Sequence, residues 1–294
     1  MKVGIYGQFY HQDSGKYIQE LLNALERDNI QIVIEKEFLH LIQNNKTVTK
    51  EYNHFSTFEE LDPSFDLFFS IGGDGTILKS INFIRDLNIP ILGINTGRLG
   101  FLATIQKEEI ARSISTLLQK KYSISERTVL SIETDPPSEE IGENNFALNE
   151  IAVSRKNTTS MITVETWLDD KCLTSYWADG LIISTPTSST GYSLSCGGLI
   201  IVPNTDALVI TPIAPHNLNA RPLVIKDNTK ITLKVSGREN NYLVSMDSRI
   251  ATLSNETTIT IKTAPFKISM VELHTDSFLQ TLRKKLLWGE DRRN

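Results

Sequence analysis

The chain has 294 residues, of which 40% are hydrophobic and 22% charged, a balance typical of a soluble globular protein with one large domain or two ordinary ones. Its formal net charge of −5, with no basic block at either end, argues against broad binding of nucleic acid or of anionic membranes. The chain has only two cysteines, which argues against a disulfide framework and favours a cytoplasmic protein. No apolar stretch approaches the roughly 20 residues of a membrane span, which argues against a membrane protein.

The first third of the chain alternates short apolar runs with helical patterns. Strands are predicted over residues 1–7, 30–38, 65–71 and 89–95. Helices are predicted over 14–29, 76–87 and 108–122, and Ser14 is placed to cap the first of them. Unbroken apolar strands that alternate with helices are typical of an α/β unit with a parallel sheet.

The pattern changes near residue 122, after which period-two alternation predicts a β-rich half with sheet packed on sheet. The predicted elements are strands over 123–134 and 257–263, a hairpin over 162–178 with Asp169 and Asp170 at its turn, a second hairpin over 230–248, and a final amphipathic helix over 276–289. We therefore predict a Rossmann-like α/β domain of residues 1–122 with segment 266–294, whose C-terminal helix packs back on it. Residues 123–265 are expected to form a β-sandwich-like domain.

The stretch FDLFFSIGGDGTILKSINFI, residues 65–84, places glycines and an acid where a strand meets a helix. Gly72, Gly73 and Gly75 allow a ligand to approach the main chain, and the helix N-terminus favours an anion. A simple tight turn is the alternative interpretation. The carboxylate of Asp74 would repel bound phosphates, unless it accepts a hydroxyl proton or meets a cation, the two uses of an acid in phosphoryl transfer. A helix-capping role for Asp74 remains open.

The GGDGT motif resembles a signature shared by NAD kinases, by diacylglycerol and sphingosine kinases and, in close variants, by phosphofructokinases. Alone it indicates an enzyme that phosphorylates a hydroxyl. Three further stretches, INTGRLGFL (94–102), FALNEIAVSR (146–155) and ADGLIISTPTSSTGYSLSCGG (178–198), match the NAD kinase signatures in the family's order. With PIAPHNLNARPLV (212–224), the resemblance to the NAD kinase family spans nearly the whole chain.

The residues from Ser184 to Ser195 are nearly all small or hydroxylic, so this stretch offers neutral donors and acceptors to a ribose and a base. A surface linker is the alternative, but the strand-like stretches LIIS before it and GGLIIV after it argue against one.

The resemblance implies an enzyme that moves the γ-phosphoryl group of ATP to the 2′-hydroxyl of the adenosine ribose of NAD, giving NADP and ADP. It gives Asp74 the role of general base. Lys79, one helical turn after the loop, is either a phosphate ligand or an ordinary surface lysine. A divalent cation, Mg²⁺ or Mn²⁺, is expected to arrive with ATP, since the five histidines are scattered and no dedicated metal cluster is visible.

The resemblance further implies that the α/β domain binds nucleotide and that the β-rich domain binds NAD. It implies that Asn149 and Glu150 bind the adenine or ribose part of NAD and that Asp179 binds its nicotinamide end. Glu150 taken alone would be interpreted as a solvated strand residue. The other positions that match the family's binding residues are Phe101, Thr187, Thr190, Gly191, Tyr192, Ser193, Leu194, Ser195, Ala214, Asp247 and Arg249. Ala214 matches a backbone contact to the adenine, and Asp247 a residue contributed by a neighbouring subunit of a homodimer or homotetramer. The site is expected in a cleft between the two domains.

The chain departs from the family pattern at three places. Trp177 stands where many members have arginine, which puts one phosphate or ribose contact in doubt. The run Thr187-Ser188-Ser189-Thr190 has a side chain at a position where many members have glycine, and Gly191 replaces the commoner alanine. A lipid or sugar kinase and a non-catalytic NAD(P)-binding sensor are the competing hypotheses. The choice between ATP and polyphosphate, and between NAD and NADH, stays open.

Overall fold

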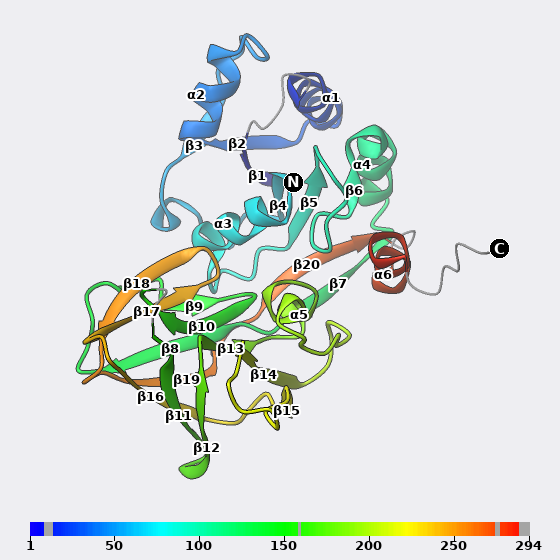
Figure 1. Ribbon diagram of the computed structural model, residues 1–294. Coiled ribbons are helices and arrows are strands. Elements are labelled where there is room, and N and C mark those ends of the chain that lie inside the picture. The colour runs from blue at the N-terminus through cyan, green and yellow to red at the C-terminus, as the bar shows by residue number, and fades with distance from the viewer. Residues whose placement is uncertain (9–13, 158–159, 274–276, 288–294) are drawn as a thin grey trace, which may run out of the picture. The chain divides into compact units, whose positions relative to one another are not determined.

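The computed structural model describes residues 1–8, 14–157, 160–273 and 277–287 (Figure 1). The chain separates into two compact units: unit 1 consists of Met1–Glu126 and Ile268–Asn294, and unit 2 of Arg127–Lys267. The domain boundaries predicted from the sequence lie after residues 122 and 265. None of the helices formed by the described residues combines the length and the apolar character that crossing a membrane requires.

Unit 1 contains one sheet flanked by helices. Its strands are β1 (Lys2–Gly7), β2 (Gln31–Glu35), β3 (Asn53–Phe55), β4 (Leu67–Gly72), β5 (Ile91–Asn95), β6 (Ile105–Gln106), β7 (Tyr122–Arg127) and β20 (Ile268–Leu273). Its helices are α1 (Ser14–Arg27), α2 (Lys36–Asn44), α3 (Asp74–Ile84), α4 (Ile110–Leu118) and α6 (Phe278–Leu286), with short 3-10 turns at Phe58–Glu60 and Lys107–Glu109.

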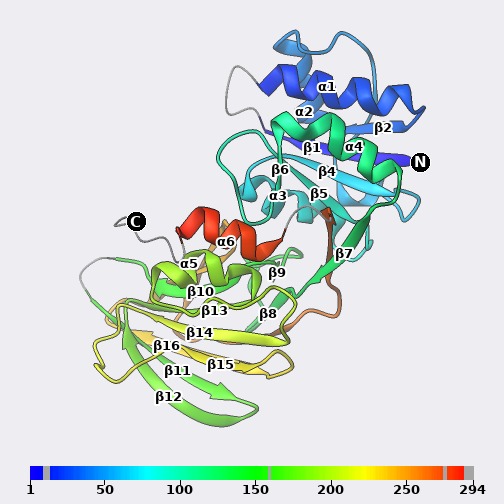
Figure 2. The same cartoon turned by 90° about the vertical axis from the view of Figure 1, so that its right-hand side faces the viewer.

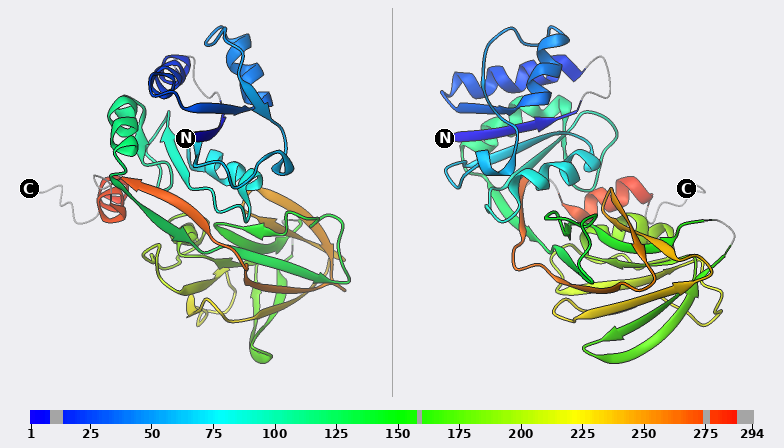
Figure 3. Two further views of the ribbon diagram at one scale, coloured as in Figure 1. Left: turned by 180° about the vertical axis from the view of Figure 1, so that it is seen from behind. Right: turned by 90° about the vertical axis from the view of Figure 1, so that its left-hand side faces the viewer.

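The strand order in this sheet is β3-β2-β1-β4-β5-β20-β7, with β6 beside β5. The pairs that join β3, β2, β1, β4 and β5 are all parallel, and so is the pair of β5 with β20. Figure 3 shows β20, close to the C-terminus, running alongside β7. The direction of strand succession reverses between β1 and β4, and open α/β sheets bind ligands at the carboxyl ends of strands beside such a reversal.

The two faces of this sheet are covered by different helices. Along β4, the buried side chains of Leu67, Phe69 and Ile71 point into one apolar cluster, to which α1, α2 and α4 also contribute. Figure 2 shows α1 and α4 lying side by side. The alternate residue Ser70 faces α3, where the Ser80 hydroxyl donates to its oxygen at 2.9 Å. Both faces are buried, which explains the continuous apolar run that predicted this strand.

Two local predictions in this unit are wrong. The strand predicted over 30–38 ends at Glu35, and α2 follows at once. The Glu35 carboxylate accepts the N–H groups of Glu37 and Phe38, at 3.0 and 2.8 Å, and so caps α2. Ser14 does not cap α1, because it is already helical and its buried hydroxyl has no hydrogen-bond partner.

The C-terminal helix α6 belongs to unit 1, as the predicted fold required. The ring of Phe278 lies 6.1 Å from that of Phe101, and the Lys285 ammonium lies 4.8 Å from the centre of the Phe101 ring. The helix was predicted over 276–289, of which residues 276, 288 and 289 lie outside the described residues. Helix α6 thus packs against the loop that carries Phe101.

Unit 2 contains two six-stranded antiparallel sheets, and the predicted sandwich-like fold is confirmed. One sheet has the order β15-β14-β13-β10-β17-β18 and the other β12-β11-β16-β19-β8-β9. These strands are β8 (Leu130–Asp135), β9 (Phe146–Ala147), β10 (Glu150–Arg155), β11 (Ile162–Leu168), β12 (Lys171–Ala178), β13 (Gly180–Ser184), β14 (Ala207–Ile213), β15 (Leu223–Lys226), β16 (Ile231–Gly237), β17 (Asn241–Met246), β18 (Arg249–Ser254) and β19 (Thr258–Thr263). Alternate side chains of both sheets meet in one buried cluster.

The hairpin predicted over 162–178 is confirmed, with Asp169 and Asp170 at its turn in the left-handed region (φ 47° and 65°). The hairpin predicted over 230–248 is wrong. Its first strand, β16, pairs with β11 and β19, whereas β17 pairs with β10 and β18 in the other sheet. The predicted strand 123–134 is two strands, β7 and β8, in different sheets, and the strand-like stretch 199–202 forms no strand.

Candidate active site

The GGDGT loop joins the carboxyl end of β4 to α3. Gly73 occupies the helix N-cap, and its N–H donates to the Thr76 hydroxyl at 3.3 Å, so Asp74 is the first helical residue and not the cap. A Cβ at Gly72 would lie 2.1 Å from that hydroxyl oxygen, so only glycine fits there. Apart from the chain neighbours and the backbone of the helix itself, no atom of the described residues lies within 4 Å of a Cβ built at Gly73 or Gly75. These two glycines are not required by the protein's own packing and leave open space at the helix N-terminus.

The Asp74 carboxylate holds a second loop of unit 1. Its Oδ2 accepts the N–H of Phe101 at 2.7 Å, and its Oδ1 accepts those of Leu102 and Ala103 at 3.0 Å each. A Cβ at Gly100 would lie 1.8 Å from Oδ1, so glycine leaves room for the carboxylate. A carboxylate offers about four lone-pair sites, so three are occupied and one, on Oδ2, remains. We call these three contacts the Asp74 clamp.

A pocket of about 190 Å³ lies beside the glycines. It is lined by Gly72, Gly73, Gly75, Thr76, Asn95, Thr96, Gly97 and Arg98. Residues 95–98 form the second part of its wall, and Asn95 fixes the shape of this part. The Asn95 Oδ1 accepts the Gly97 N–H at 2.7 Å, and its Nδ2 donates to the Arg98 carbonyl at 2.5 Å. The positive end of α3 and the Arg98 side chain favour an anion in this pocket.

Sequence reasoning did not single out Asn95, Thr96 or Arg98, although the run NTGR directly after a predicted strand was an available signal. Lys79, by contrast, is exposed on α3 and does not line the pocket. Phe101 is half-buried against α6 and reaches the site through its backbone N–H in the Asp74 clamp.

Asn149 and Glu150, at the start of β10 in unit 2, are held by a similar arrangement. Asp247 lies at the turn between β17 and β18 with φ 54°, and its carboxylate accepts the N–H groups of Leu148, Asn149 and Glu150 at 3.0, 2.8 and 3.2 Å. The Asp247 N–H donates to the Glu150 carbonyl at 3.0 Å. We call these contacts the Asp247 clamp. Asp247 is thus engaged within its own unit.

Glu150 is 8% exposed and accepts a short hydrogen bond from the Ser188 hydroxyl. Its pKa is raised from 4.5 to about 7, mainly by burial; the Ser188 hydrogen bond opposes this shift, and the Asp247 charge adds a smaller raising contribution. Burial also raises the pKa of Asp247, against the backbone N–H groups and the Arg249 charge that lower it. Glu150 is therefore a buried acid that titrates near neutral pH, which is typical of a functional site.

The hydroxyl-rich stretch forms a 3-10 turn (Thr187–Thr190) and a single helical turn, α5 (Tyr192–Ser195). Ser188 and Thr185 point inward: the Thr185 hydroxyl donates to the Leu148 carbonyl at 2.7 Å. Ser193 is also buried, and its hydroxyl lies 2.9 Å from that of Thr211. The outward-facing members of the predicted set are Gly191, Tyr192 and Ser195, whereas Thr190 and Leu194 are half-buried and Thr187 is buried with an unpartnered hydroxyl oxygen.

Asp179 and Trp177 lie at the end of β12. The Asp179 carboxylate forms an ion pair with Arg155 at 2.9 Å. Trp177 is 45% exposed and its indole packs on the ring of His216, with centroids 4.4 Å apart. Ala214 follows β14 in a left-handed conformation (φ 43°), which is uncommon for a residue with a side chain and recurs at functional sites.

Arg249 also acts within unit 2. Its guanidinium donates to the carbonyls of Asn144 and Phe146 and lies 5.0 Å from the centre of the Phe146 ring. Within the described residues, no three His, Cys, Asp or Glu side chains gather in a group able to hold a metal ion. Two of the scattered histidines, His11 and His274, lie outside the described residues.

Replacing Asp247 by Asn tests the Asp247 clamp. Asparagine keeps the left-handed backbone, but one oxygen becomes an NH₂ group that faces a backbone N–H, which costs about 1–3 kcal/mol for the unsatisfied donor. We expect the free energy of unfolding, measured by urea denaturation at pH 7, to fall by that amount. Asp170→Asn is the matched control, because its ion pair with Lys230 is exposed and contributes less than about 1 kcal/mol. Equal stability losses in both variants would contradict the clamp.

Comparisons with known proteins point to the same family along the whole chain. The family model of the ATP-NAD kinase N-terminal domain matches residues 3–122, and that of the ATP-NAD kinase C-terminal domain matches residues 148–273. Among curated relatives, the NAD kinase of Christiangramia forsetii is 70% identical over 294 residues, and that of Flavobacterium psychrophilum is 58% identical over 294 residues. In both cases the match covers 100% of each chain.

Two solved structures share the fold at low sequence identity. A yeast NADH kinase complexed with NADH has a TM-score of 0.84 at 22% identity, and the match covers 99% of this chain and 89% of that one. An NAD kinase from Archaeoglobus fulgidus in complex with ATP has a TM-score of 0.74 at 23% identity, with 97% of each chain covered.

Proposed function

The chain belongs to the NAD kinase family and is a phosphotransferase that phosphorylates NAD, and we propose how its residues divide the work. The γ-phosphoryl group of ATP moves to the 2′-hydroxyl of the adenosine ribose of NAD, which gives NADP and ADP. The observation that carries this proposal is the Asp74 clamp beside an open anion pocket, because it places a fixed carboxylate next to a site suited to phosphates.

We assign the ATP phosphates to the pocket beside Gly73 and Gly75. Backbone N–H groups at the start of α3 and the Arg98 guanidinium supply positive charge there, and the two glycines let the phosphates approach the main chain. A loose phosphoryl-transfer transition state needs mainly alignment and neutralisation of charge, which this arrangement offers.

Asp74 is the proposed general base. The three N–H groups of its clamp hold the carboxylate in one orientation, and the remaining lone pair on Oδ2 is the one available to the 2′-hydroxyl proton. A base positioned in this way contributes about 10²–10⁴-fold to the rate. Both roles of Asp74, the clamp and the base, need its ionised form.

Unit 2 is the proposed NAD-binding unit. Asn149 and Glu150 are assigned to the adenine or ribose part of NAD and Asp179 to its nicotinamide end, with contacts from Thr187, Thr190 and the segment 191–195, and the Ala214 backbone on the adenine. Two contacts in unit 2 support these assignments. The Asp247 clamp fixes the backbone of Asn149 and Glu150, and Arg155 fixes the Asp179 carboxylate. Because Ser193 bonds to Thr211, its contribution is proposed through its backbone.

A divalent cation, Mg²⁺ or Mn²⁺, is proposed to arrive with the ATP phosphates. The donors near the glycine loop fit this route: the clamp takes three of the four lone-pair sites of Asp74, and the side-chain oxygens that line the pocket belong to Thr76, Asn95 and Thr96. Mg²⁺ is commonly bound through substrate phosphates and one or two protein oxygens. When bound, it would neutralise phosphate charge.

Self-association into a homodimer or homotetramer is also part of the proposal. Unit 2 exposes several large apolar side chains, namely those of Leu199, Val202, Leu218, Val224 and Ile250. Exposed apolar side chains of this size become buried when chains associate, which favours self-association. Sedimentation of the purified chain measures its mass. The contribution of Asp247 to a neighbouring subunit stays a prediction, as does the cytoplasmic location.

One assay separates the candidate functions: purified protein is incubated with NAD, ATP and Mg²⁺, and NADP formation is followed. The proposal expects NADP that depends on all three components. Phosphorylation of lipid or sugar without NADP would favour the lipid or sugar kinase. Binding of NAD without NADP under any metal or donor would favour the non-catalytic sensor. Replacing ATP by polyphosphate, and NAD by NADH, settles the choice of donor and acceptor.

Replacing Trp177 by Arg tests the departure from the family pattern. The exposed indole offers no charge, whereas a guanidinium forms charge-assisted hydrogen bonds with a phosphate. We expect the KM for NAD to fall by about three- to tenfold with kcat unchanged, the signature of added uniform binding, measured by initial rates. Ser175→Arg, two residues earlier on β12, adds the same charge and should leave KM unchanged. An unchanged KM in Trp177→Arg means that the missing arginine has no role in this chain.

A further inference from the structure

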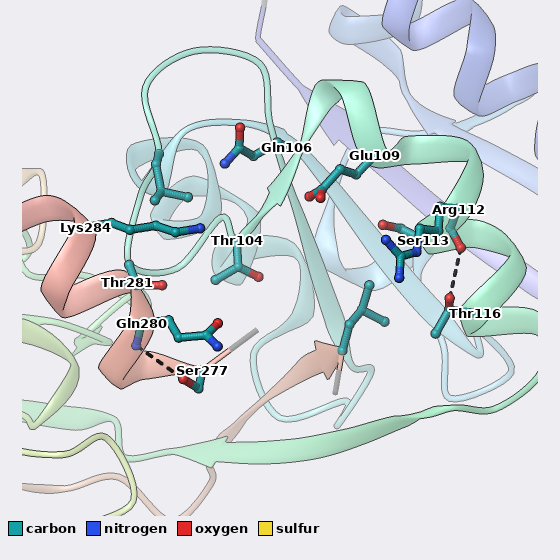
Figure 4. A pocket seen from close by; sticks show the side chains of 12 residues that line it. Thr104, Gln106, Glu109, Arg112, Ser113, Thr116, Ser277, Gln280, Thr281 and Lys284 are labelled. Carbon is teal, nitrogen blue, oxygen red and sulfur yellow. Dashed lines mark hydrogen bonds between the residues drawn. The ribbon is translucent and has the colours of Figure 1, made fainter. Parts of the chain in front are cut away.

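A second pocket of unit 1, of about 170 Å³, shares no lining residue with the glycine-loop pocket. Its walls come from β6, α4, α6 and the end of the loop that carries Phe101. Figure 4 shows side chains from these elements pointing into one hollow: Lys284 extends from α6 toward Thr104 and Gln106, and Glu109 and Arg112 enter from the side of α4. The proposed reaction uses none of them.

The charges in this pocket favour an anion. Arg112 and Lys284 bring two positive charges and Glu109 one negative charge. In the described part of the chain, neither the Arg112 guanidinium nor the Lys284 ammonium forms an ion pair. Hydroxyl groups of Ser113 and Thr281, both less than 8% exposed, lie in the same wall and add neutral donors.

The size of the pocket restricts the ligand. Pockets for drug-sized molecules usually measure roughly 300–1,000 Å³, so this one suits a small ion or one phosphoryl group. Arginine pairs with phosphate through two parallel N–H donors, and lysine acts as a compact charge beside it. Hydrogen phosphate also carries one O–H, which the Glu109 carboxylate is able to accept. We propose that this pocket binds a phosphate-class oxyanion, with Arg112 and Lys284 as its charged ligands.

The position of this phosphate pocket links it to the Asp74 clamp. Leu99 and Thr104 line the pocket and flank the run 100–103, in which the N–H groups of residues 101–103 hold Asp74. Helix α6, which carries Lys284, also packs on the Phe101 ring through Phe278. An anion that joins α4 to α6 therefore stabilises the run that presents the clamp amides.

The test is thermal unfolding of the full chain in rising inorganic phosphate, with ionic strength held constant by chloride. A ligand that binds only the folded state raises Tm, and we expect a rise of about 2–4 °C once phosphate exceeds its Kd several-fold. Glycerol phosphate in a parallel series distinguishes a free ion from a phosphoryl group on a larger molecule, and a response to either supports the site. No rise with either compound would overturn the proposal.

Variants locate the response. Arg112→Gln and Lys284→Gln should each lower the rise, whereas Arg283→Gln, the same change on a neighbouring residue of α6, should retain it in full. Because the glycine-loop pocket also favours an anion, Arg98→Gln should lose only the share that phosphate in that pocket contributes. A rise that stays undiminished in both of the first two variants, or that vanishes completely in Arg98→Gln, would overturn the site. If either glutamine variant is unfolded in chloride, Arg112→Lys and Lys284→Arg replace them, and a weakened rise is then expected.

Hydrogen exchange of the clamp amides tests whether phosphate in this pocket stabilises the Asp74 clamp. Phosphate should slow exchange of the Leu102 and Ala103 amides at least threefold in the wild type and not in Lys284→Gln. Unchanged exchange in the wild type, despite a rise in Tm, would contradict the link to the Asp74 clamp. Neither measurement uses enzymatic activity, so the proposed reaction and this site are able to fail independently.

Discussion

Asp74→Asn is expected to lower kcat for NADP formation at least 100-fold, the lower end of a general-base contribution. Asparagine cannot accept the proton of the 2′-hydroxyl. Its Oδ1 still accepts the N–H groups of Leu102 and Ala103, so two contacts of the clamp survive while the NH₂ group faces the N–H of Phe101. The Kd for NAD, measured by calorimetry, should change less than about threefold, because the other residues assigned to NAD lie in unit 2 and Asp74 is proposed to contact only its 2′-hydroxyl.

Two measurements make this result specific. Asp86→Asn removes the same charge from an exposed position shortly after α3 and should leave kcat unchanged. Amide exchange of Ala103 in Asp74→Asn should stay slow, which assigns the lost turnover to the missing base. Fast exchange of this amide would instead make Asp74 a positioning residue that acts through the loop. Turnover equal to that of the wild type would remove Asp74 from the catalytic role.

The strand–loop–helix around GGDGT was predictable because its signals are local. A buried parallel strand is apolar on both faces, and glycines end it directly before a helical pattern. The partners of Asp74 were not predictable, because residues 101–103 lie 27 to 29 positions away along the chain. Only the tertiary fold brings two parallel strand ends, Gly72 and Asn95, side by side.

The wrong hairpin over 230–248 has the same cause. Period-two alternation indicates that a segment is a strand with one buried face, but it does not say which strand lies beside it. In a sandwich, consecutive strands either pair or cross to the other sheet, and both choices bury the same alternate residues. Here β16 and β17 lie in different sheets, yet Leu233 and Val244 enter one core.

The missed helix α2 shows a limit of short patterns. Its buried residues Phe38, Leu39 and Ile42 directly continue the apolar strand β2, so the change of period falls within a few residues. The capping carboxylate of Glu35 was the available signal, since it receives two N–H groups of the first turn. Glutamate is not among the preferred capping residues, so this signal is weak.

Glu150→Gln is expected to make the protein more stable at pH 8 and to leave its stability near pH 4 almost unchanged. Burial raises the pKa of Glu150 from 4.5 to about 7, so below pH 4.5 the group is neutral in both folded and unfolded chains. Between these values the folded chain holds a proton that the unfolded chain has lost, and the free energy of unfolding falls as pH rises. At about 1.4 kcal/mol per pKa unit, the cost above pH 7 is on the order of 3 kcal/mol.

Glutamine removes that cost and still accepts the Ser188 hydroxyl, so the difference between variant and wild type should grow from pH 5 to pH 8. Urea unfolding followed by tryptophan fluorescence measures it, and Glu165→Gln, an exposed glutamate on β11, should show no such growth. A difference that is constant with pH would contradict a titration of Glu150 near neutral pH.

The titration of Glu150 should also change NAD binding, because Glu150 is proposed to bind the adenosine ribose. The ionised carboxylate is an acceptor only and forms stronger, charge-assisted hydrogen bonds to ribose hydroxyls, so the KM for NAD should fall as pH rises through about 7 and should be flat in Glu150→Gln. The charge of Asp247 raises the pKa of Glu150, so Asp247→Asn should move this midpoint to lower pH. A midpoint that stays in place in Asp247→Asn would mean that burial alone sets it, and that the clamp positions Asn149 and Glu150 without tuning their charge.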